Sequence, residues 1–384
     1  MKPVFNTLAD LYEHSCKEFS KRLAITYIDG TQSYSYEQFK DSCDNLSRIL
    51  SNFGIGANDK VAILSENMPH WAIAFFSITA FGRVAVPMLP DISADEAENI
   101  LAHSESKAIF ISRKQFPKLK QERIEKLELV IAIEDFSFIK AEGTEYTCDG
   151  VIGIPTPLDI AAILYTSGTT GKAKGVMLCH RNFCTNVLNA WHSFKVGKKD
   201  RFLSILPMAH TYEMSIGMLY PFALGSSVHH IKSAPTPSVL MPAFKRLRPT
   251  VMLTVPLIIE KIYKSSVLPT IKKSRFLTYL QENIPFLLHF LVGIKLKKTF
   301  GGKLRFYGIG GAKLDTSVEV FLKKAGFPYA IGYGLTETAP LICAAAPHKT
   351  HVGTTGPVVP GIQVRLDNVN PMTGEGEIVV KGPI

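Results

Sequence analysis

Short apolar runs rich in Val, Ile and Leu recur along the first third of the chain, and they constrain the fold more than any other feature. Four such runs lie at residues 61–64, 84–86, 108–111 and 129–133. Because none alternates between apolar and polar residues, each predicts a strand covered on both faces. Stretches of helical length separate them, including one that begins after Ser93 with Glu96 in the capping position. This order predicts an α/β fold with a mostly parallel sheet between layers of helices.

A second series of strands and helices follows a polar connection, rich in Gly, Thr and Pro, at residues 142–157. Strands are expected at residues 160–165, 202–205, 227–231, 251–255, 304–307 and 329–332. Helices are expected at residues 180–194, 213–224, 238–247, 257–267 and 316–325. The last residues differ, with frequent Gly and Pro and a short strand at 377–381. We therefore expect two α/β subdomains, residues 1–157 and 158–345, and the start of a smaller β subdomain at 346–384.

The composition excludes several classes of protein. With 46% hydrophobic residues, the chain is not expected to be mostly disordered. Six cysteines without a CxxC pair form neither a disulfide scaffold nor a zinc pattern, which favours a reduced, cytoplasmic setting. The N-terminal residues predict a capped amphipathic helix rather than a secretory signal, and the apolar run at 71–82 is too short to span a bilayer.

Positive charge is concentrated in one segment of this chain, whose formal net charge is +10. Residues 260–305 contain ten Lys or Arg against two acidic residues, and they surround an apolar stretch at 284–292. One interpretation is a buried helix with solvated basic flanks. The other is a surface that contacts anionic lipid at the inner face of the membrane, or an anionic ligand. The sequence has no basic-aromatic motif typical of nucleic-acid binding, so nucleic acid is not expected as a partner.

The strongest local signal is a loop at residues 165–176, Tyr-Thr-Ser-Gly-Thr-Thr-Gly-Lys-Ala-Lys-Gly-Val, which follows a predicted buried strand. Its glycines allow backbone N–H groups to approach a phosphate, its hydroxyls add donors, and its lysines compensate negative charge. The spacing differs from the GxxxxGK(S/T) loop of P-loop NTPases and from the GxGxxG of dinucleotide sites. On loop chemistry alone, a flexible glycine-rich surface loop is the alternative.

The loop resembles the signature of the adenylate-forming superfamily, which includes acyl-CoA synthetases, luciferases and peptide-synthetase adenylation domains. It departs from the pattern Y-T-S-G-T-T-G-x-P-K-G-V at Ala173, where proline is usual; this loosens the loop slightly but keeps the phosphate donors. Four more segments match in the family's order: 207–213 (PMAHTYE), 307–312 (YGIGGA), 333–338 (YGLTET) and 374–383 (GEGEIVVKGP). The resemblance implies two mixed, mostly parallel sheets with flanking helices and part of a small β-barrel subdomain.

In this superfamily an aspartate-bearing segment, a hinge and a C-terminal domain with a lysine needed for adenylation follow the segments matched here. The chain also stops only three residues after its last predicted strand. We therefore expect it to be the AMP-binding N-terminal domain of a longer ligase, inactive alone.

The resemblance also implies a role for each matching residue in binding ATP and Mg²⁺. Phosphate binding is expected from Thr166, Ser167, Gly168, Thr169, Thr170, Gly171 and Lys174. The adenosine is expected to border on Gly310, Gly311, Ala312, Gly332, Tyr333 and Gly334. Thr336 would hydrogen-bond the α-phosphate, Glu337 would bind Mg²⁺, and His210 would line the acyl pocket; Thr336, Glu337 and Lys174 are the expected catalytic residues. Taken singly, Glu337 also fits a helix-start carboxylate, Tyr333 a core residue, and His210 a half-buried histidine.

The implied reaction has two steps: a carboxylate and ATP give acyl-adenylate and pyrophosphate, and the thiol of coenzyme A then displaces AMP. Residues 255–263 and the apolar-basic insert after them resemble the bacterial long-chain fatty acid–CoA ligases. Candidates for an adaptable apolar acyl pocket, each also consistent with the core, are Met208, Met214, Met218 and Tyr220. Two alternatives stay open: a fatty-acyl-AMP ligase that acylates a carrier protein, and a non-catalytic protein that binds nucleotide or acyl groups.

Overall fold

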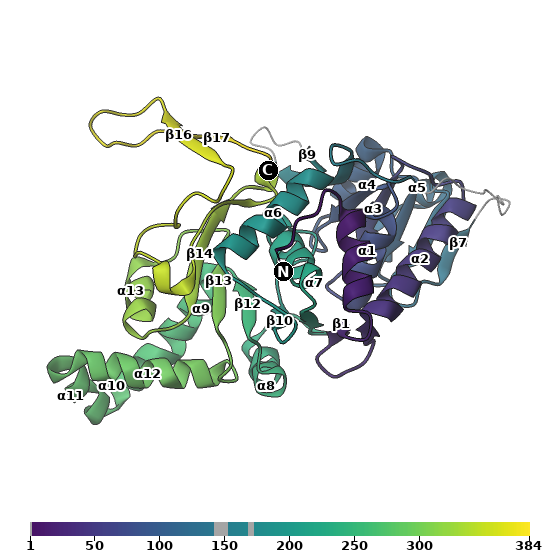
Figure 1. Ribbon diagram of the computed structural model, residues 1–384. Coiled ribbons are helices and arrows are strands. Elements are labelled where there is room, and N and C mark those ends of the chain that lie inside the picture. The colour runs from purple at the N-terminus through teal and green to yellow at the C-terminus, as the bar shows by residue number, and fades with distance from the viewer. Residues whose placement is uncertain (1, 142–152, 168–172) are drawn as a thin grey trace.

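Two sheets with helices packed on them form the body of the protein in this computed structural model, which describes residues 2–141, 153–167 and 173–384 (Figure 1). The expected α/β class with two large, mostly parallel sheets is confirmed. A two-stranded hairpin of β16 (Gln363–Asp367) and β17 (Glu377–Lys381) is separate from both sheets.

The seven-stranded sheet is built mainly from the first apolar runs. Its order is β7 (Phe138–Ala141), β6 (Leu129–Ala132), β5 (Ala108–Ile111), β3 (Lys60–Leu64), β4 (Val84–Met88), β8 (Ile160–Ser167) and β9 (Ala173–Cys179). The edge strands β7 and β9 run antiparallel to their neighbours, and the pairs between them are parallel. Burial on both faces explains the lack of alternation, because Ile63 packs with α3 (Pro69–Thr79) and Leu64 with α4 (Ala94–Ser104).

The eight-stranded sheet carries the second series. Its order is β15 (Leu341–Ala344), β14 (Tyr329–Gly334), β13 (Phe306–Ile309), β12 (Val251–Thr254), β10 (Arg201–Ser204), β11 (Ser227–His230), β1 (Leu23–Tyr27) and β2 (Tyr34–Ser35). The strands from β14 to β1 are parallel, so their carboxyl ends lie along one edge. The strand expected at 304–307 begins two residues later.

Helices cover both faces of the eight-stranded sheet. One face packs on α1 (Leu8–Glu18), α6 (His180–Ser193), the π-helix η2 (Glu213–Leu219) and α7 (Tyr220–Ala223). The same core includes α2 (Tyr36–Asn52) and α3, and so joins the two sheets. The other face packs on α8 (Pro237–Leu247), α9 (Pro256–Ile262) and α13 (Thr316–Lys324).

The sheets do not follow the expected division at residue 157. Strand β8, expected to open the second series, pairs with β4 in the first sheet, and β1 from the N-terminal region pairs with β11 in the second. Both pairings join segments far apart in the sequence, so the local patterns that predict a strand do not predict its sheet.

Three helices form a lobe that projects from the eight-stranded sheet (Figure 1): α10 (Leu268–Lys273), α11 (Arg275–Asn283) and α12 (Pro285–Thr299). The interpretation of residues 284–292 as a buried helix is wrong. Helix α12 buries Leu288, Gly293 and Leu296 but leaves Phe286 75% and Phe290 59% exposed. Apolar side chains therefore occupy both faces of α12. For this reason the sequence alone does not show which face of the helix points outward. Among the helices that the structure describes, none has the length and apolarity needed to cross a bilayer.

Candidate functional site

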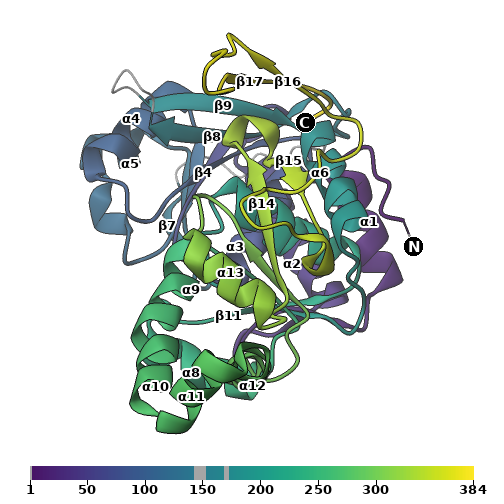
Figure 2. The ribbon, with the colours of Figure 1, turned by 90° about the vertical axis from the view of Figure 1, so that its left-hand side faces the viewer.

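Three of the segments that resemble the family motifs, 207–213, 307–312 and 333–338, lie at the carboxyl ends of strands of the eight-stranded sheet, whereas 374–383 lies in the separate β16–β17 hairpin. Residues 310–312 follow β13, residues 332–334 end β14, and the turn η4 (Thr336–Thr338) comes next. Figure 2 shows the β8–β9 hairpin of the other sheet close to β14 and β15. In open parallel sheets, ligands bind at this edge because the loops there converge.

The phosphate-loop signature lies at the end of the β8–β9 hairpin. Thr166 pairs with Lys174 across the two antiparallel strands, and β9 contacts η4. Lys174 is exposed and forms no ion pair with any described residue. Gly168, Thr169, Thr170 and Gly171 lie outside the described residues, as does the side chain of Ser167. The strand that carries the exposed Lys174 thus lies beside the turn that carries Thr336 and Glu337.

The Thr336–Glu337 turn is fixed by buried side chains from two helices. The amide of Asn186 on α6 donates to the carbonyl of Thr338 at 3.0 Å and accepts from the N–H of Leu341 at 2.7 Å. The hydroxyl of Ser215 on η2 donates to the carbonyl of Ala339 at 2.7 Å. We did not predict either residue from the sequence. A buried Asn on the apolar face of a predicted helix, beside Phe183 and Val187, is the signal that could have found the first.

The side chains of Thr336 and Glu337 are left free by this arrangement. Glu337 is exposed and Thr336 half-buried, and neither side chain has a hydrogen-bond partner in the part of the chain that is described. Glu337 is therefore not the backbone-bonded helix-start carboxylate of the alternative interpretation. Tyr333, paired with Cys343, is half-exposed rather than a core residue. A free carboxylate on a turn that contacts β9 fits Mg²⁺, which binds through one or two carboxylates plus substrate phosphates.

Two glycines at the end of β14, Gly332 and Gly334, have different roles. A Cβ at Gly332 would come no closer than 3.6 Å, to Leu341, which is ordinary contact, so the protein itself does not require glycine there. A Cβ at Gly334 would clash with the carbonyl of Pro340, so that glycine is needed for the fold. Gly311 has φ of 85°, which an L side chain rarely adopts. Gly332 therefore marks a space that a ligand can fill.

His210 lies at the open side of the site, in the segment between β10 and η2. Its Nδ1 accepts a hydrogen bond from the N–H of Tyr212 at 3.2 Å, and the ring is exposed rather than half-buried. Asn67, from the loop after β3, anchors this segment by accepting from the N–H of Met208 at 2.9 Å. Asn67 was not predicted from the sequence either, and it ties the first sheet to the candidate site.

An apolar cavity of about 30 Å³ extends beneath the site, between α6, η2 and the strands β13 and β14. Its lining includes Ala190, Tyr212, Ile216, Gly308, Ala330 and Gly332. The four residues suggested for an acyl pocket, Met208, Met214, Met218 and Tyr220, do not line this cavity; they are at most 2% exposed and belong to the core. The sequence pattern predicts that these four residues are buried, but it does not predict which buried residues face a ligand.

Glu213 is a buried carboxyl group next to the cavity-lining Tyr212. Burial raises the pKa of Glu213 to about 8, although a hydrogen bond with Ser204 acts in the opposite direction. The group is therefore mostly protonated at neutral pH, and its Oε2 has no partner among the described residues. A neutral, enclosed acid of this kind adds no negative charge to the site.

Known proteins resemble the chain in sequence and in fold. Long chain acyl-CoA synthetase 5 of Arabidopsis thaliana is 28% identical over 438 residues, covering 99% of this chain and 64% of the relative. The chloroplastic long-chain-fatty-acid–acyl-carrier-protein ligase AEE15 of the same plant is 26% identical, covering 99% and 63%. The inhibitor-bound N-terminal domain of FACL13 from Mycobacterium tuberculosis has a TM-score of 0.77 at 18% identity, covering 99% of this chain and 89% of that one.

The chain spans less than two thirds of the length of these curated relatives. The family model described as AMP-binding enzyme matches residues 12–384, which contain every segment that meets at the site. On that match, the chain belongs to the AMP-binding enzyme family.

Proposed function

We propose that the protein activates a long-chain fatty acid with ATP and transfers the acyl group to coenzyme A. The observation that carries this proposal is the contact of β9, which carries Lys174, with the turn that carries Thr336 and Glu337. None of these three side chains has a partner among the described residues, and Gly332, shortly before the turn, lines an apolar cavity. A polar, cationic edge suits a triphosphate, and the apolar space beneath suits an acyl group. The names of the relatives support a long-chain acid.

In the first step, a carboxylate oxygen of the acid attacks the α-phosphorus of ATP. A new P–O bond forms, the bond from the α-phosphorus to the bridging oxygen breaks, and pyrophosphate leaves with the electron pair. Catalysis of such a transfer is mainly positioning and charge neutralisation. The Thr336 hydroxyl donates to a non-bridging α-phosphate oxygen, and the Lys174 ammonium offsets negative charge. Mg²⁺, held by Glu337, would supply further neutralisation of the phosphates.

In the second step, the thiol of coenzyme A loses its proton to solvent and its sulfur attacks the acyl carbonyl carbon. A C–S bond forms, the C–O bond to the phosphate breaks, and AMP leaves with the electron pair. We assign to the exposed His210 the role of orienting the reacting carboxyl group. Gly332 lines the cavity and, together with Tyr333, is expected to border the adenosine. A cavity of about 30 Å³ has the volume of about one water molecule, so an acyl chain enters only if side chains move.

The test uses the full-length protein with palmitate, ATP, Mg²⁺ and coenzyme A. We expect AMP and a palmitoyl thioester in equal amounts. The variants Thr336→Val and Glu337→Gln should lower AMP release about 100-fold. Glu122→Gln, an exposed change outside the matched segments, is the matched control and should be neutral.

A second acceptor is favoured by one specific observation, the likeness to a ligase named for the acyl carrier protein. If the protein releases AMP and pyrophosphate but forms palmitoyl thioester only when carrier protein replaces coenzyme A, the acceptor assignment is wrong and the adenylation stands. If no acid supports AMP release, a binding role replaces catalysis.

A further inference from the structure

We propose that helices α11 and α12 form a docking surface for an anionic lipid bilayer. The lobe they belong to is held rigidly on the protein, because α12 packs closely on α13. A Cβ at Gly293 would clash with the carbonyl of Ala325, so the two helices approach as near as their backbones allow. Leu288 and Leu296 bury the same face of α12. The opposite face thereby points to solvent. The lobe itself lies at one end of the molecule (Figure 2).

The outward face of α12 is apolar. Phe286, Phe290 and Ile294 are 75%, 59% and 40% exposed. They follow one another at intervals of four residues, so they form a single row along the helix. Helix α11 adds Phe276 and Tyr279, which are 62% and 57% exposed three residues apart. Single exposed apolar residues are ordinary on a protein surface, but five on two consecutive helices mark an interaction surface.

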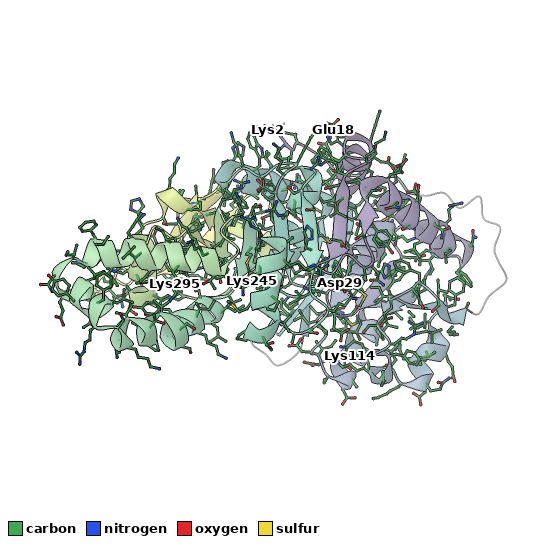
Figure 3. All side chains as sticks on the ribbon, turned by 90° about the horizontal axis from the view of Figure 1, so that it is seen from below. Lys2, Glu18, Asp29, Lys114, Lys245 and Lys295 are labelled. Carbon is green, nitrogen blue, oxygen red and sulfur yellow. The ribbon has the colours of Figure 1, made fainter. Side chains whose placement is uncertain are left out.

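Basic residues flank this face. Between residues 268 and 299 there are six Lys or Arg and one acidic residue, Glu282. None of the six makes an ion pair with a residue that the structure describes. They are Lys272, Lys273, Arg275, Lys295, Lys297 and Lys298. Figure 3 shows side chains standing out around the lobe, with Lys295 on α12.

An anionic bilayer is the partner that satisfies both features. Helices that lie in a membrane interface bury an aromatic, aliphatic face to the level of the headgroups, and flanking lysines attract anionic lipid. A second copy of this chain fits worse, because each lobe would bring the same unpaired positive charge to the contact. The length of α12, 15 residues, suits a helix that lies on the bilayer rather than across it.

Docking would hold the protein where fatty acids partition, and this consequence rests on the proposed function. The docking itself does not. If the protein binds vesicles but does not adenylate a fatty acid, the docking surface is supported and the proposed activity is wrong. If it adenylates a fatty acid but does not bind vesicles, the activity is supported and the docking surface is wrong.

The test is sedimentation of the full-length protein with vesicles of phosphatidylcholine alone and with vesicles containing about a third phosphatidylglycerol. We expect binding to the second kind, at least tenfold stronger than to the first and weakened at about 0.5 M salt. Phe286→Ser with Phe290→Ser should lower it at least tenfold, as should Lys295→Gln with Lys298→Gln. Met372→Ser and Lys21→Gln, exposed changes elsewhere, are the controls.

All four Phe and Lys positions are exposed or on the outward face, so the variants should melt at the wild-type temperature. Equal binding to both kinds of vesicle, no binding to either, or binding that neither pair of substitutions weakens would overturn the proposal. A further outcome is that the wild type forms a dimer and binds no vesicles. If the double variant Phe286→Ser, Phe290→Ser then dissociates that dimer, the surface serves self-association instead.

Discussion

The side-chain amide of Asn186 donates a hydrogen bond of 3.0 Å to the carbonyl of Thr338, the residue directly after the proposed catalytic pair. The oxygen of the same amide accepts a hydrogen bond from the N–H of Leu341, so Asn186 links the end of the turn to the start of β15. Asn186 is fully buried. It is a positioning residue, since it acts on Thr336 and Glu337 only through the backbone that carries them.

We expect Asn186→Ala to lower kcat about 10- to 100-fold while the KM for the fatty acid changes less than threefold. Two buried backbone groups lose their partners, which also costs about 1–3 kcal/mol of stability for each. The control is Asn189→Ala, about one turn further along α6, because Asn189 is also buried and its side-chain amide donates no hydrogen bond to a described residue. If both variants lose stability and kcat alike, Asn186 has a purely structural role.

Removing the amino group of Lys174 should impair the reaction without affecting the fold. The side chain is exposed and has no ion-pair partner among the described residues, so Lys174→Ala should melt within about 2 °C of the wild type. If the ammonium offsets phosphate charge, kcat/KM for ATP should fall about 100-fold. Steady-state kinetics with ATP varied measure this, and Lys126→Ala serves as the exposed control. An unchanged kcat/KM in Lys174→Ala would show that Lys174 does not bind the phosphates of ATP.

Gly332→Ala tests whether the space beside Leu341 belongs to a ligand. The added methyl group would make only ordinary contact within the protein, so the melting temperature should stay within about 2 °C. If substrate occupies the space, kcat/KM for the acid should fall at least tenfold. Gly197→Ala, where a Cβ would meet no atom within 4 Å, is the matched control. Equal kinetics in the two variants would show that no substrate group lies against Gly332.

The strand and helix positions could largely be predicted from the sequence, because periodicity and capping residues are local. The β17 strand begins and ends where predicted, and Ser93 caps α4 with Glu96 as its spacing indicates. Sheet membership could not be predicted, since the pairing of β8 with β4 depends on residues far apart in the chain. The outward face of α12 was hidden for a related reason: apolar side chains surround that helix, and only its packing on α13 decides which of them are covered.

The residues of the candidate site could also be predicted only in part from the sequence. Motif residues such as Thr336 and Glu337 could be identified by resemblance, but the residues that hold them could not. Asn186 and Asn67 act through hydrogen bonds to segments more than a hundred residues away, and no local pattern encodes such a partner.

Asp200 and Arg305 form a partly buried ion pair that should govern stability in acid. Arg305 Nε donates to Asp200 Oδ1 at 2.8 Å, and Thr250 donates to the same oxygen. Burial alone would raise the pKa of Asp200, but these hydrogen bonds outweigh it and hold the pKa below its usual value. A carboxyl group of this kind stabilises the fold above its unfolded pKa, and the stabilisation is lost as pH falls through the folded pKa.

We expect Asp200→Asn to lower the free energy of unfolding at pH 7 by about 1–3 kcal/mol, discounted because Arg305 is 45% exposed. As pH falls below the usual range of an aspartate pKa, the difference from the wild type should shrink. Urea unfolding at a series of pH values measures it, with Asp41→Asn on the surface as control. A difference that stays constant with pH would exclude ionised Asp200 as its cause.

Glu213 should give the opposite dependence on pH. Its pKa is raised by burial to about 8, from a usual value of 4.5, so the folded protein holds a proton that the unfolded chain has lost. Between these two values the folded state binds more protons, and the free energy of unfolding must fall as pH rises. Below about pH 4.5 both states are protonated and the group causes no change; above about pH 8 the loss is complete.

Glu213→Gln keeps the shape of the side chain but cannot ionise. The variant should therefore gain in melting temperature relative to the wild type as pH rises from about 5 to 8, and the gain should level off above that. Thermal melts at five or six pH values test this, with the exposed change Glu122→Gln as control. If the two melting curves stay parallel across the range, Glu213 does not change its protonation on unfolding, and the enclosed carboxyl group is charged in the folded protein after all.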